Sequence, residues 1–413
     1  MKIFEDTSVG CNLHTLANGL RIIHQPSRSQ VAYCGFAVDA GTRDELPDEP
    51  GMAHFVEHLI FKGTHKRKAW HILNRMEAVG GDLNAYTNKE ETVIYSAFLT
   101  EHFGRAFELL ADIVFHSTFP AHELEKETEV IIDEIQSYED TPSELIFDDF
   151  EDLIFAGDSL GHNILGTKES VMNLTSEDCR NWLNKYYNVS HVILFYAGSS
   201  GVNKFRAEAE KYFSELPAGS PVAVRESLGF FPLFDEHRVI DSHQSHVVMG
   251  AGLQTCSMAE RTVLALLTNI VGGPGMNSLL NVSLRERRGL VYNVEASTTM
   301  FSNGGEFTIY FGCDPGDVPL CRQIVERQIA DLAEHPLSER CLSAAKKQYL
   351  GQLILADDNR DNRAIAIARA TLFRGKALTS GEMTELVRDV SAESLRQAAE
   401  KVSRLSVLTM GPR

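Results

Sequence analysis

Residues 50–63 read PGMAHFVEHLIFKG and hold the most informative pattern of the chain, His54-Phe55-Val56-Glu57-His58. The segment carries the signals of a helix. Pro50 suits the first turn, where no backbone donor is needed, and Gly63 suits the C-terminal cap. We therefore predict a helix over Pro50–Lys62 with the five-residue pattern in its middle.

The pattern has the spacing of metal ligands. On a helix, residues i and i+4 lie one turn apart on the same face, so His54 and His58 can bind one metal through their ring nitrogens. Glu57 lies beside that face and can reach a water held by the metal instead of the metal itself. Catalytic zinc takes three protein ligands and keeps a fourth position for water, so a third ligand must come from another element.

The third ligand is predicted to come from a second helix, Glu123–Ser137, which Pro120 opens. Its residues Glu127 and Glu134 are seven positions apart, about two turns, and share a face. Glu134 is the best candidate for the ligand. From the spacing, one of the two carboxylates can bind the metal while the other accepts a hydrogen bond from a ligand and fixes the orientation of its ring.

Both helices also have a plainer interpretation. Two histidines on a helix occur on ordinary surfaces, and the acid-rich helix Glu123–Ser137 is most simply a solvated face. Against this, Glu127 and Glu134 flank the apolar residues Val130–Ile132. A carboxylate on each side of an apolar stretch favours a functional site.

Composition limits the classes of protein to which the chain can belong. It has 413 residues, 43% of them hydrophobic and 23% charged, which is typical of globular proteins and predicts two or three domains. The formal net charge of −18 argues against a nucleic-acid-binding protein, which needs a basic face. No stretch approaches the ~20 apolar residues of a membrane span.

The chain is predicted to be cytoplasmic. Its N-terminus, MKIFEDTSVGCNLHTL, lacks the basic and apolar regions of a secretory signal. The seven cysteines are scattered and odd in number, which is typical of free thiols in a reducing compartment.

The order of elements points to an internal repeat. A strand at Val31–Ala40 precedes the helix Pro50–Lys62, and a second strand at His246–Leu253 precedes a helix at Ala259–Val271. In each half a further helix follows (Ala69–Ala78, about Ser278–Arg287) and then extended segments (Asn84–Leu99, and Tyr292–Thr298 with Glu306–Gly312). We predict an α+β fold of two similar repeats, each a mainly antiparallel sheet packed with helices.

The domain boundaries follow from the best linker. Residues 216–234, LPAGSPVAVRESLGFFPLF, are rich in proline and glycine and divide the chain almost in half. We predict an N-terminal domain over 1–215 that carries the metal site and a C-terminal domain over 235–413.

The segments HFVEHLIFKGT (54–64) and ETEVIIDEI (127–135) together resemble the inverzincin peptidases of family M16, such as pitrilysin, insulin-degrading enzyme and the mitochondrial processing peptidase. The spacing of the two segments is also similar to that of the family. The resemblance implies that His54, His58 and Glu134 bind Zn²⁺, that Glu57 is the general base, and that Glu127 supports the site.

The resemblance extends to two further segments. GGDLNAYTNKEETVIY (80–95) is similar to the edge strand along which substrates pair in that family, which implies that Asn84, Ala85 and Tyr86 bind the substrate backbone. LRERRGLVYNV (284–294) resembles the segment of the second half that carries an arginine and a tyrosine, and this implies that Arg285 and Tyr292 reach the scissile carbonyl. Without the resemblance, both residues would be interpreted as structural.

These observations predict a zinc metalloendopeptidase of extended or unfolded peptides, in which Glu57 deprotonates a water on the zinc. The chain length resembles the short subfamily, whose subunits pair around a chamber, so a homodimer, or a heterodimer with a related subunit, is expected. The alternative is a catalytically inactive scaffold or partner subunit of the same fold. Such subunits typically lose ligands of the HxxEH pattern, and this chain retains them.

Overall fold

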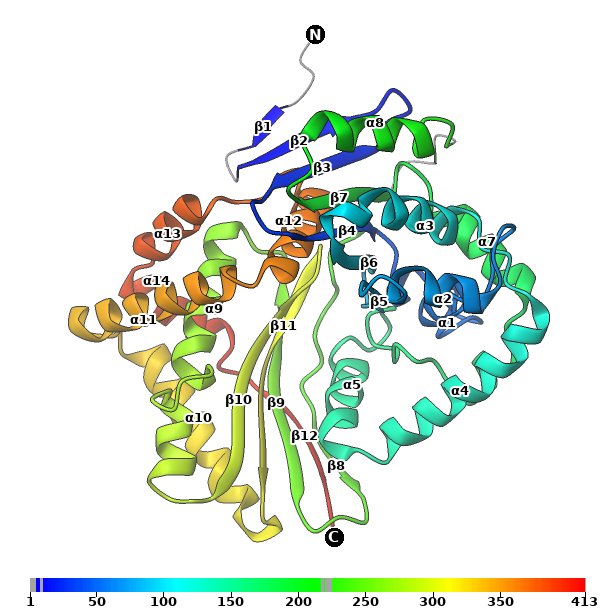
Figure 1. Ribbon diagram of the computed structural model, residues 1–413. Coiled ribbons are helices and arrows are strands. Elements are labelled where there is room, and N and C mark those ends of the chain that lie inside the picture. The colour runs from blue at the N-terminus through cyan, green and yellow to red at the C-terminus, as the bar shows by residue number, and fades with distance from the viewer. Residues whose placement is uncertain (1–4, 8–9, 217–218, 220–224, 413) are drawn as a thin grey trace. The chain divides into compact units, whose positions relative to one another are not determined.

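The computed structural model describes residues 5–7, 10–216, 219 and 225–412 (Figure 1). By their internal contacts the residues form two compact units. Unit 1 comprises 1–136, 162–224 and 357–379, and unit 2 comprises 137–161, 225–356 and 380–413. The predicted boundaries at 1–215 and 235–413 stay a prediction, and linker residues 217–218 and 220–224 lie outside the described residues. Segment 137–161 lies within the predicted N-terminal domain but groups with unit 2. Segment 357–379 lies within the predicted C-terminal domain but groups with unit 1.

Unit 1 is built on a seven-stranded sheet in the order β1-β2-β3-β7-β4-β6-β5. The strands are β1 Glu5–Thr7, β2 Cys11–Thr15, β3 Arg21–Pro26, β4 Val31–Val38, β5 Asp82–Thr87, β6 Thr92–Leu99 and β7 Val192–Gly198. The helices are α1 Met52–Leu59, α2 Ala69–Glu77, α3 Phe103–Phe115, α4 Ala121–Glu139 (in unit 1 up to Gln136), α6 Lys168–Asn173, α7 Ser176–Tyr186, α8 Val202–Phe213 and α12 Arg360–Arg374. All strand pairs are antiparallel except β3 with β7.

The central strands of unit 1 are apolar on both faces because helices cover both. On β4, Cys34, Phe36 and Val38 pack into a core with α1, α3, α7 and α8, while Ala37 faces the other way. That second face is covered by α12, through residues such as Ile367. Burial of each large aliphatic or aromatic side chain contributes roughly 1.5–3 kcal/mol, so both layers hold the sheet in place.

Unit 2 has a five-stranded sheet in the order β10-β11-β9-β12-β8. Its strands are β8 Asp235–Val239, β9 Ser245–Gln254, β10 Val291–Met300, β11 Gly304–Cys313 and β12 Ser406–Gly411. Its helices are α5 Pro142–Ile154, α9 Met258–Gly272, the π-helical segment η3 Asn281–Glu286, α10 Val318–Glu334, α11 Glu339–Asp357, α13 Ser380–Asp389 and α14 Ala392–Lys401. Residues of α9, α10 and α14 pack on one face of the sheet, and residues of α5 pack on the other.

The two sheets share one topology, which confirms the predicted α+β repeat. In unit 1 the order β3-β7-β4-β6-β5 begins with a parallel pair and continues with three antiparallel pairs. In unit 2 the order β8-β12-β9-β11-β10 has the same sequence of pairings. Unit 1 differs by the additional strands β1 and β2.

Several predicted elements have other limits in the structure. The extended segment Asn84–Leu99 is two strands of a hairpin, β5 and β6, joined by residues 88–91. The helix predicted over Pro50–Lys62 is shorter, because α1 ends at Leu59 and a turn follows. The helix near Ser278–Arg287 includes the π-helical η3. No helix among the described residues is both long and apolar enough to cross a membrane.

Candidate metal centre

The position of α1 is fixed at its N-terminus. Gly51 is the N-cap residue with φ +90°, a left-handed conformation that favours glycine, and a Cβ at this position would lie 2.7 Å from the carbonyl oxygen of Leu165. The buried carboxylate of Glu45 accepts hydrogen bonds from the backbone amides of Gly51 (2.9 Å) and Ala53 (2.8 Å). Amides of the first turn have no partner within the helix, so Glu45 takes the role of a capping side chain.

Packing then sets the direction in which the polar residues of α1 point. Phe55, Val56 and Leu59 are fully buried in the core of unit 1. His54 and His58 share a different face, and their ring centroids are 4.6 Å apart. The i, i+4 spacing predicted from the sequence therefore brings the two imidazoles together.

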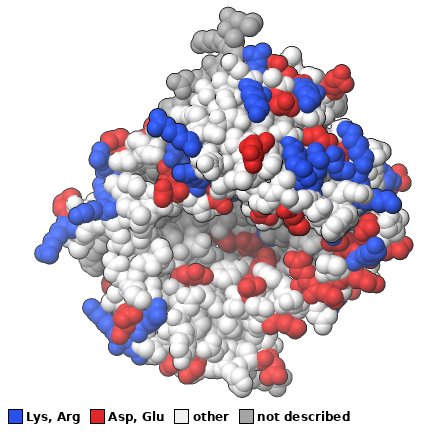
Figure 2. Space-filling model, viewed as in Figure 1, with Lys and Arg blue, Asp and Glu red and all other residues white. Residues whose placement is uncertain are grey.

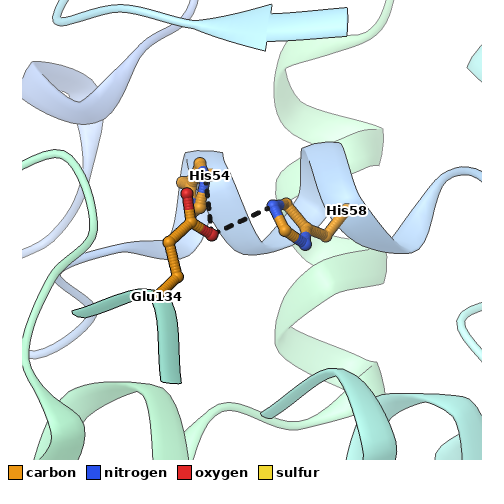
Figure 3. Close-up of side chains that lie close together, drawn as sticks. All are labelled: His54, His58 and Glu134. Atoms are coloured by element: carbon orange, nitrogen blue, oxygen red, sulfur yellow. Dashed lines mark ion pairs between the residues drawn. The ribbon is translucent and has the colours of Figure 1, made fainter. Parts of the chain in front are cut away.

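Glu134 of α4 completes a group of three (Figure 3). Its Oε2 lies 4.0 Å from Nε2 of His54 and 3.6 Å from Nε2 of His58. One ligand atom from each residue can be chosen so that all lie within 4.8 Å of one another, and among the described residues this is the one such group of histidine, cysteine and acidic residues.

The three residues fit a zinc ion. Ligand atoms about 2.0–2.1 Å from a tetrahedral metal lie about 3.3 Å from one another, slightly less than the distances here. Two imidazole nitrogens and a carboxylate oxygen are a donor set of catalytic zinc sites. Burial, reinforced by the neighbouring His58, lowers the pKa of His54 to about 3, so its ring is neutral at neutral pH and offers a lone pair.

Glu127 of α4 contacts His58 at the ring nitrogen that does not face Glu134. Its Oε1 lies 3.0 Å from Nδ1 of His58, and its Oε2 lies 2.7 Å from Nζ of Lys62. Burial acts to raise the pKa of Glu127, but the hydrogen bonds from His58 and Lys62 outweigh it and lower the pKa. Glu127 is thus an ionised acceptor for the ring of His58. The supporting role that the resemblance implies for Glu127 stays a prediction.

The rest of α4 explains why it is so acidic. Glu125, Glu129 and Asp133 are exposed at successive turns, and Figure 2 shows acidic side chains gathered over this helix. Glu127 is 5% exposed, and it is the buried acid of α4. The solvated-face interpretation therefore holds for part of the helix, and the face with Glu127 and Glu134 meets the histidines of α1.

Glu57 lies on α1 within the electrostatic influence of His58 and Glu134. Burial is the largest effect and raises its pKa, although a hydrogen bond with Thr87 acts in the opposite direction. Thr87, at the end of β5, has its hydroxyl 3.3 Å from that of Thr92. A carboxyl with a raised pKa beside a candidate metal site suits proton transfer near neutral pH.

The predicted substrate-binding residues lie on an edge. Asn84, Ala85 and Tyr86 belong to β5, which is the last strand of the unit 1 sheet and pairs with β6. Asn84 is exposed, and the other two are partly buried.

Arg285 and Tyr292 belong to unit 2. Arg285 is exposed on η3, and Tyr292 is 84% exposed at the start of β10, an edge strand. The roles predicted for both residues stay predictions.

Sequence reasoning missed four supporting residues: Glu45, Lys62, Thr87 and His162. The sequence carried a signal for Lys62, because Lys62 follows His58 by four residues, the same spacing that separates His58 from His54. In the predicted helix over Pro50–Lys62 this spacing places all three on one face. No local sequence pattern indicated the roles of Glu45, Thr87 and His162, because their partners are distant in the chain or lie on other elements. His162 Nε2, for example, lies 2.9 Å from Oε2 of Glu45.

Two family profiles match successive parts of the chain, and relatives of known sequence match nearly all of it. A profile described as Insulinase (Peptidase family M16) matches residues 21–168, and one described as Peptidase M16 inactive domain matches 173–349. An uncharacterised zinc protease of Bacillus subtilis is 31% identical over 94% of this chain and 95% of its own. An uncharacterised zinc protease of Streptomyces coelicolor is 30% identical over 96% of this chain and 89% of its own.

Solved structures show the same fold. A crystal structure of a peptidase M16 inactive domain from Pseudomonas fluorescens superposes with a TM-score of 0.90 at 18% identity, over 98% of this chain and 98% of that one. A protease from Helicobacter pylori superposes with a TM-score of 0.87 at 19% identity, over 97% of this chain and 99% of that one. The profiles together span most of the sequence and the relatives nearly all of it, so the chain belongs to peptidase family M16.

Proposed function

We propose that the protein is a zinc-dependent metalloendopeptidase that hydrolyses extended or unfolded peptides. The observation that carries the proposal is the convergence of His54, His58 and Glu134 from two helices, with Glu57 beside them. Membership of the M16 family and the zinc protease names of relatives support it.

His54, His58 and Glu134 would hold the ion. When bound, zinc polarises the substrate carbonyl and makes water a better nucleophile at neutral pH. Glu57 would take the proton of the attacking water and pass it to the leaving amine. Its raised pKa favours the first transfer, because a carboxylate with a higher pKa is a stronger base and accepts the proton of water more readily.

Glu127 would orient the ring of His58, and the free edge of β5 would position the peptide. An extended backbone can add to that edge at Asn84, Ala85 and Tyr86 as a further strand, which selects for unfolded substrates and only weakly for their sequence. Arg285 and Tyr292 would donate hydrogen bonds to the reacting carbonyl or to its neighbour.

Two further features belong to the proposal. We infer a homodimer, or a heterodimer with a related subunit, as the active form. We also infer a cytoplasmic location, which rests on cysteine usage, since none of the seven cysteines is joined in a disulfide.

The test is zinc content together with cleavage of a quenched fluorescent peptide. The expected result is one zinc per chain and cleavage that a chelator stops and added zinc restores. A folded chain that binds no zinc and cleaves no peptide would be an inactive scaffold or partner subunit instead. The inactive-domain description of the profile at 173–349 makes that outcome worth testing.

A further inference from the structure

Lys62 reaches the metal centre without belonging to the predicted set of residues. It follows α1 in a turn whose backbone is fixed by a hydrogen bond of 3.0 Å from its own amide to the carbonyl of Leu59. Its Nζ lies 2.7 Å from Oε2 of Glu127. Since Oε1 of the same carboxylate lies 3.0 Å from Nδ1 of His58, the two oxygens of Glu127 have one partner each.

The backbone around Lys62 explains why these groups meet. The next residue, Gly63, accepts a hydrogen bond of 3.0 Å from the amide of Thr118, and a Cβ on Gly63 would lie 3.0 Å from Cγ of Pro120. Pro120 starts α4, because its carbonyl accepts the amide of Leu124. The turn after α1 is therefore hydrogen-bonded to, and packed against, the residues that begin α4, the helix that carries Glu127.

A carboxylate in this position needs a charged partner. Glu127 is 5% exposed, and an ionised group buried to that degree is costly unless it is paired and hydrogen-bonded. His58 supplies one donor and Lys62 supplies the positive charge. With only one of these contacts the carboxylate could rotate away from Nδ1 of His58.

The orientation of Glu127 decides which nitrogen of His58 can bind metal. A neutral imidazole carries one proton, and the nitrogen without it is the one that can act as ligand. A carboxylate held at Nδ1 keeps the proton there, which leaves the lone pair on Nε2. Nε2 is the nitrogen that faces Glu134, at 3.6 Å.

We propose that Lys62 is a positioning residue of the metal centre, which holds Glu127 so that His58 keeps its proton on Nδ1 and presents Nε2 to the ion. The part that concerns the ion rests on the proposed function. The part that concerns the proton of His58 does not, since it applies equally to the metal-free protein.

The first measurement is the tautomer of His58 in metal-free full-length protein, by two-bond ¹⁵N–¹H correlation NMR at a pH where the ring is neutral. Wild type and Lys62→Arg, which keeps the charge, are expected to hold the proton on Nδ1. Lys62→Met, which keeps the length of the chain but not the charge, is expected to populate both tautomers. A wild-type tautomer in Lys62→Met would overturn the proposal.

The second measurement is zinc affinity in competition with a chromophoric chelator. Loss of a residue that orients a ligand typically weakens metal binding about 10–100-fold, and this is expected for Lys62→Met, with recovery in Lys62→Arg. Lys126→Met is the matched control, because Lys126 is an exposed lysine of α4 that pairs with Glu123 at 3.4 Å. Wild-type zinc affinity in Lys62→Met would contradict the link to the ion.

The two measurements separate this proposal from the proposed function. If wild type binds no zinc, the function fails while the tautomer still decides the role of Lys62. If wild type binds zinc and Lys62→Met matches it in both measurements, only the role of Lys62 fails. Circular dichroism checks folding, and Lys62→Gln, which has a polar but uncharged end, replaces Lys62→Met if the latter does not fold.

Discussion

The backbone amide of Ala53 donates a hydrogen bond of 2.8 Å to Oε1 of Glu45, immediately before the first histidine of the candidate metal centre. The other oxygen of Glu45 accepts from the amide of Gly51 and lies 2.9 Å from Nε2 of His162. One buried carboxylate thus joins the start of α1 to a loop more than a hundred residues later. Because His54 and His58 belong to α1, we expect this connection to help position both side chains.

Glu45→Gln is expected to destabilise unit 1. An amide NH₂ cannot accept the hydrogen bond that one carboxylate oxygen accepts now, and a buried donor without a partner costs about 1–3 kcal/mol. The free energy of unfolding in urea measures this loss. Asp48→Asn, an exposed change in the same loop, is the control and should stay within about 0.5 kcal/mol of wild type. Equal stability of both variants would contradict the capping role.

Glu57→Gln is expected to keep zinc and lose peptidase activity. Zinc should remain because Glu57 is not a predicted ligand. Activity should be lost because the neutral amide of glutamine cannot accept the proton of water. General acid–base transfer contributes about 10²–10⁴-fold to a rate, so kcat should fall by a factor in this range. Cleavage of a fluorescent peptide and metal analysis of the same sample are the measurements. Retained turnover at full zinc content would end the general-base assignment.

Glu134→Gln is expected to lower zinc content. The carboxylate oxygen 3.6 Å from Nε2 of His58 would be replaced by a weaker neutral donor. Asp133→Asn changes the adjacent exposed residue by the same chemistry and should leave zinc content unchanged. The assignment fails if Glu134→Gln carries as much zinc as the control after dialysis against a chelator.

Acid is expected to remove a contribution of Glu260 to stability. Glu260 caps α9, accepting from the amide (3.0 Å) and hydroxyl (2.9 Å) of Ser257, and lies 3.0 Å from Nζ of Lys401. The hydrogen bonds from Ser257 and Lys401 lower its pKa from 4.5 to about 2. A carboxyl whose pKa is lower in the folded state stabilises the fold above its ordinary pKa, and that contribution disappears as pH falls toward 2.

The measurement for Glu260 is urea unfolding of wild type and Glu260→Gln across a pH series. The difference in unfolding free energy should be largest at neutral pH and should shrink below pH 4.5. A difference that does not change with pH would mean that the charge of Glu260 plays no part.

A mixed dimer tests whether Arg285 and Tyr292 act on the metal centre of the other subunit, as we expect. One subunit carries Glu57→Gln and the other carries Tyr292→Phe. If tyrosine acts across the dimer, one of two sites remains intact and about half of the activity survives. If it acts within its own chain, both sites are impaired. Homodimers of each variant are the controls.

Sequence reasoning reached the fold class because the order of elements is local information. The periodicity of segments such as Val31–Ala40 is set by burial, and both halves repeat it. The turn that divides Asn84–Leu99 was missed because residues 88–91, NKEE, lack the glycine or proline that marks most turns. Residues 88–91 are held instead by distant partners, such as Glu90 with Arg43 at 2.5 Å.

The candidate site could be predicted only where spacing along one helix carries it. His54 and His58 are neighbours by the geometry of the helix alone. Glu134 is the best candidate for the third ligand from the sequence, and the family resemblance then implies separate roles for Glu134 and Glu127. Glu45 and His162 are 117 residues apart, and nothing in either local sequence indicates the other. Such long-range contacts depend on tertiary packing, which local patterns do not encode.

The grouping of α12 with unit 1 has a consequence for synthesis of the protein. Ile367 and Leu372 cover a face of the sheet on which Ile23, Val93 and Phe195 lie. A ribosome must therefore translate nearly the whole chain before that face can be covered. A nascent chain halted before residue 357 would leave this apolar face of the sheet exposed. Incomplete chains that expose such a surface are bound by chaperones, and they aggregate if they leave the ribosome early.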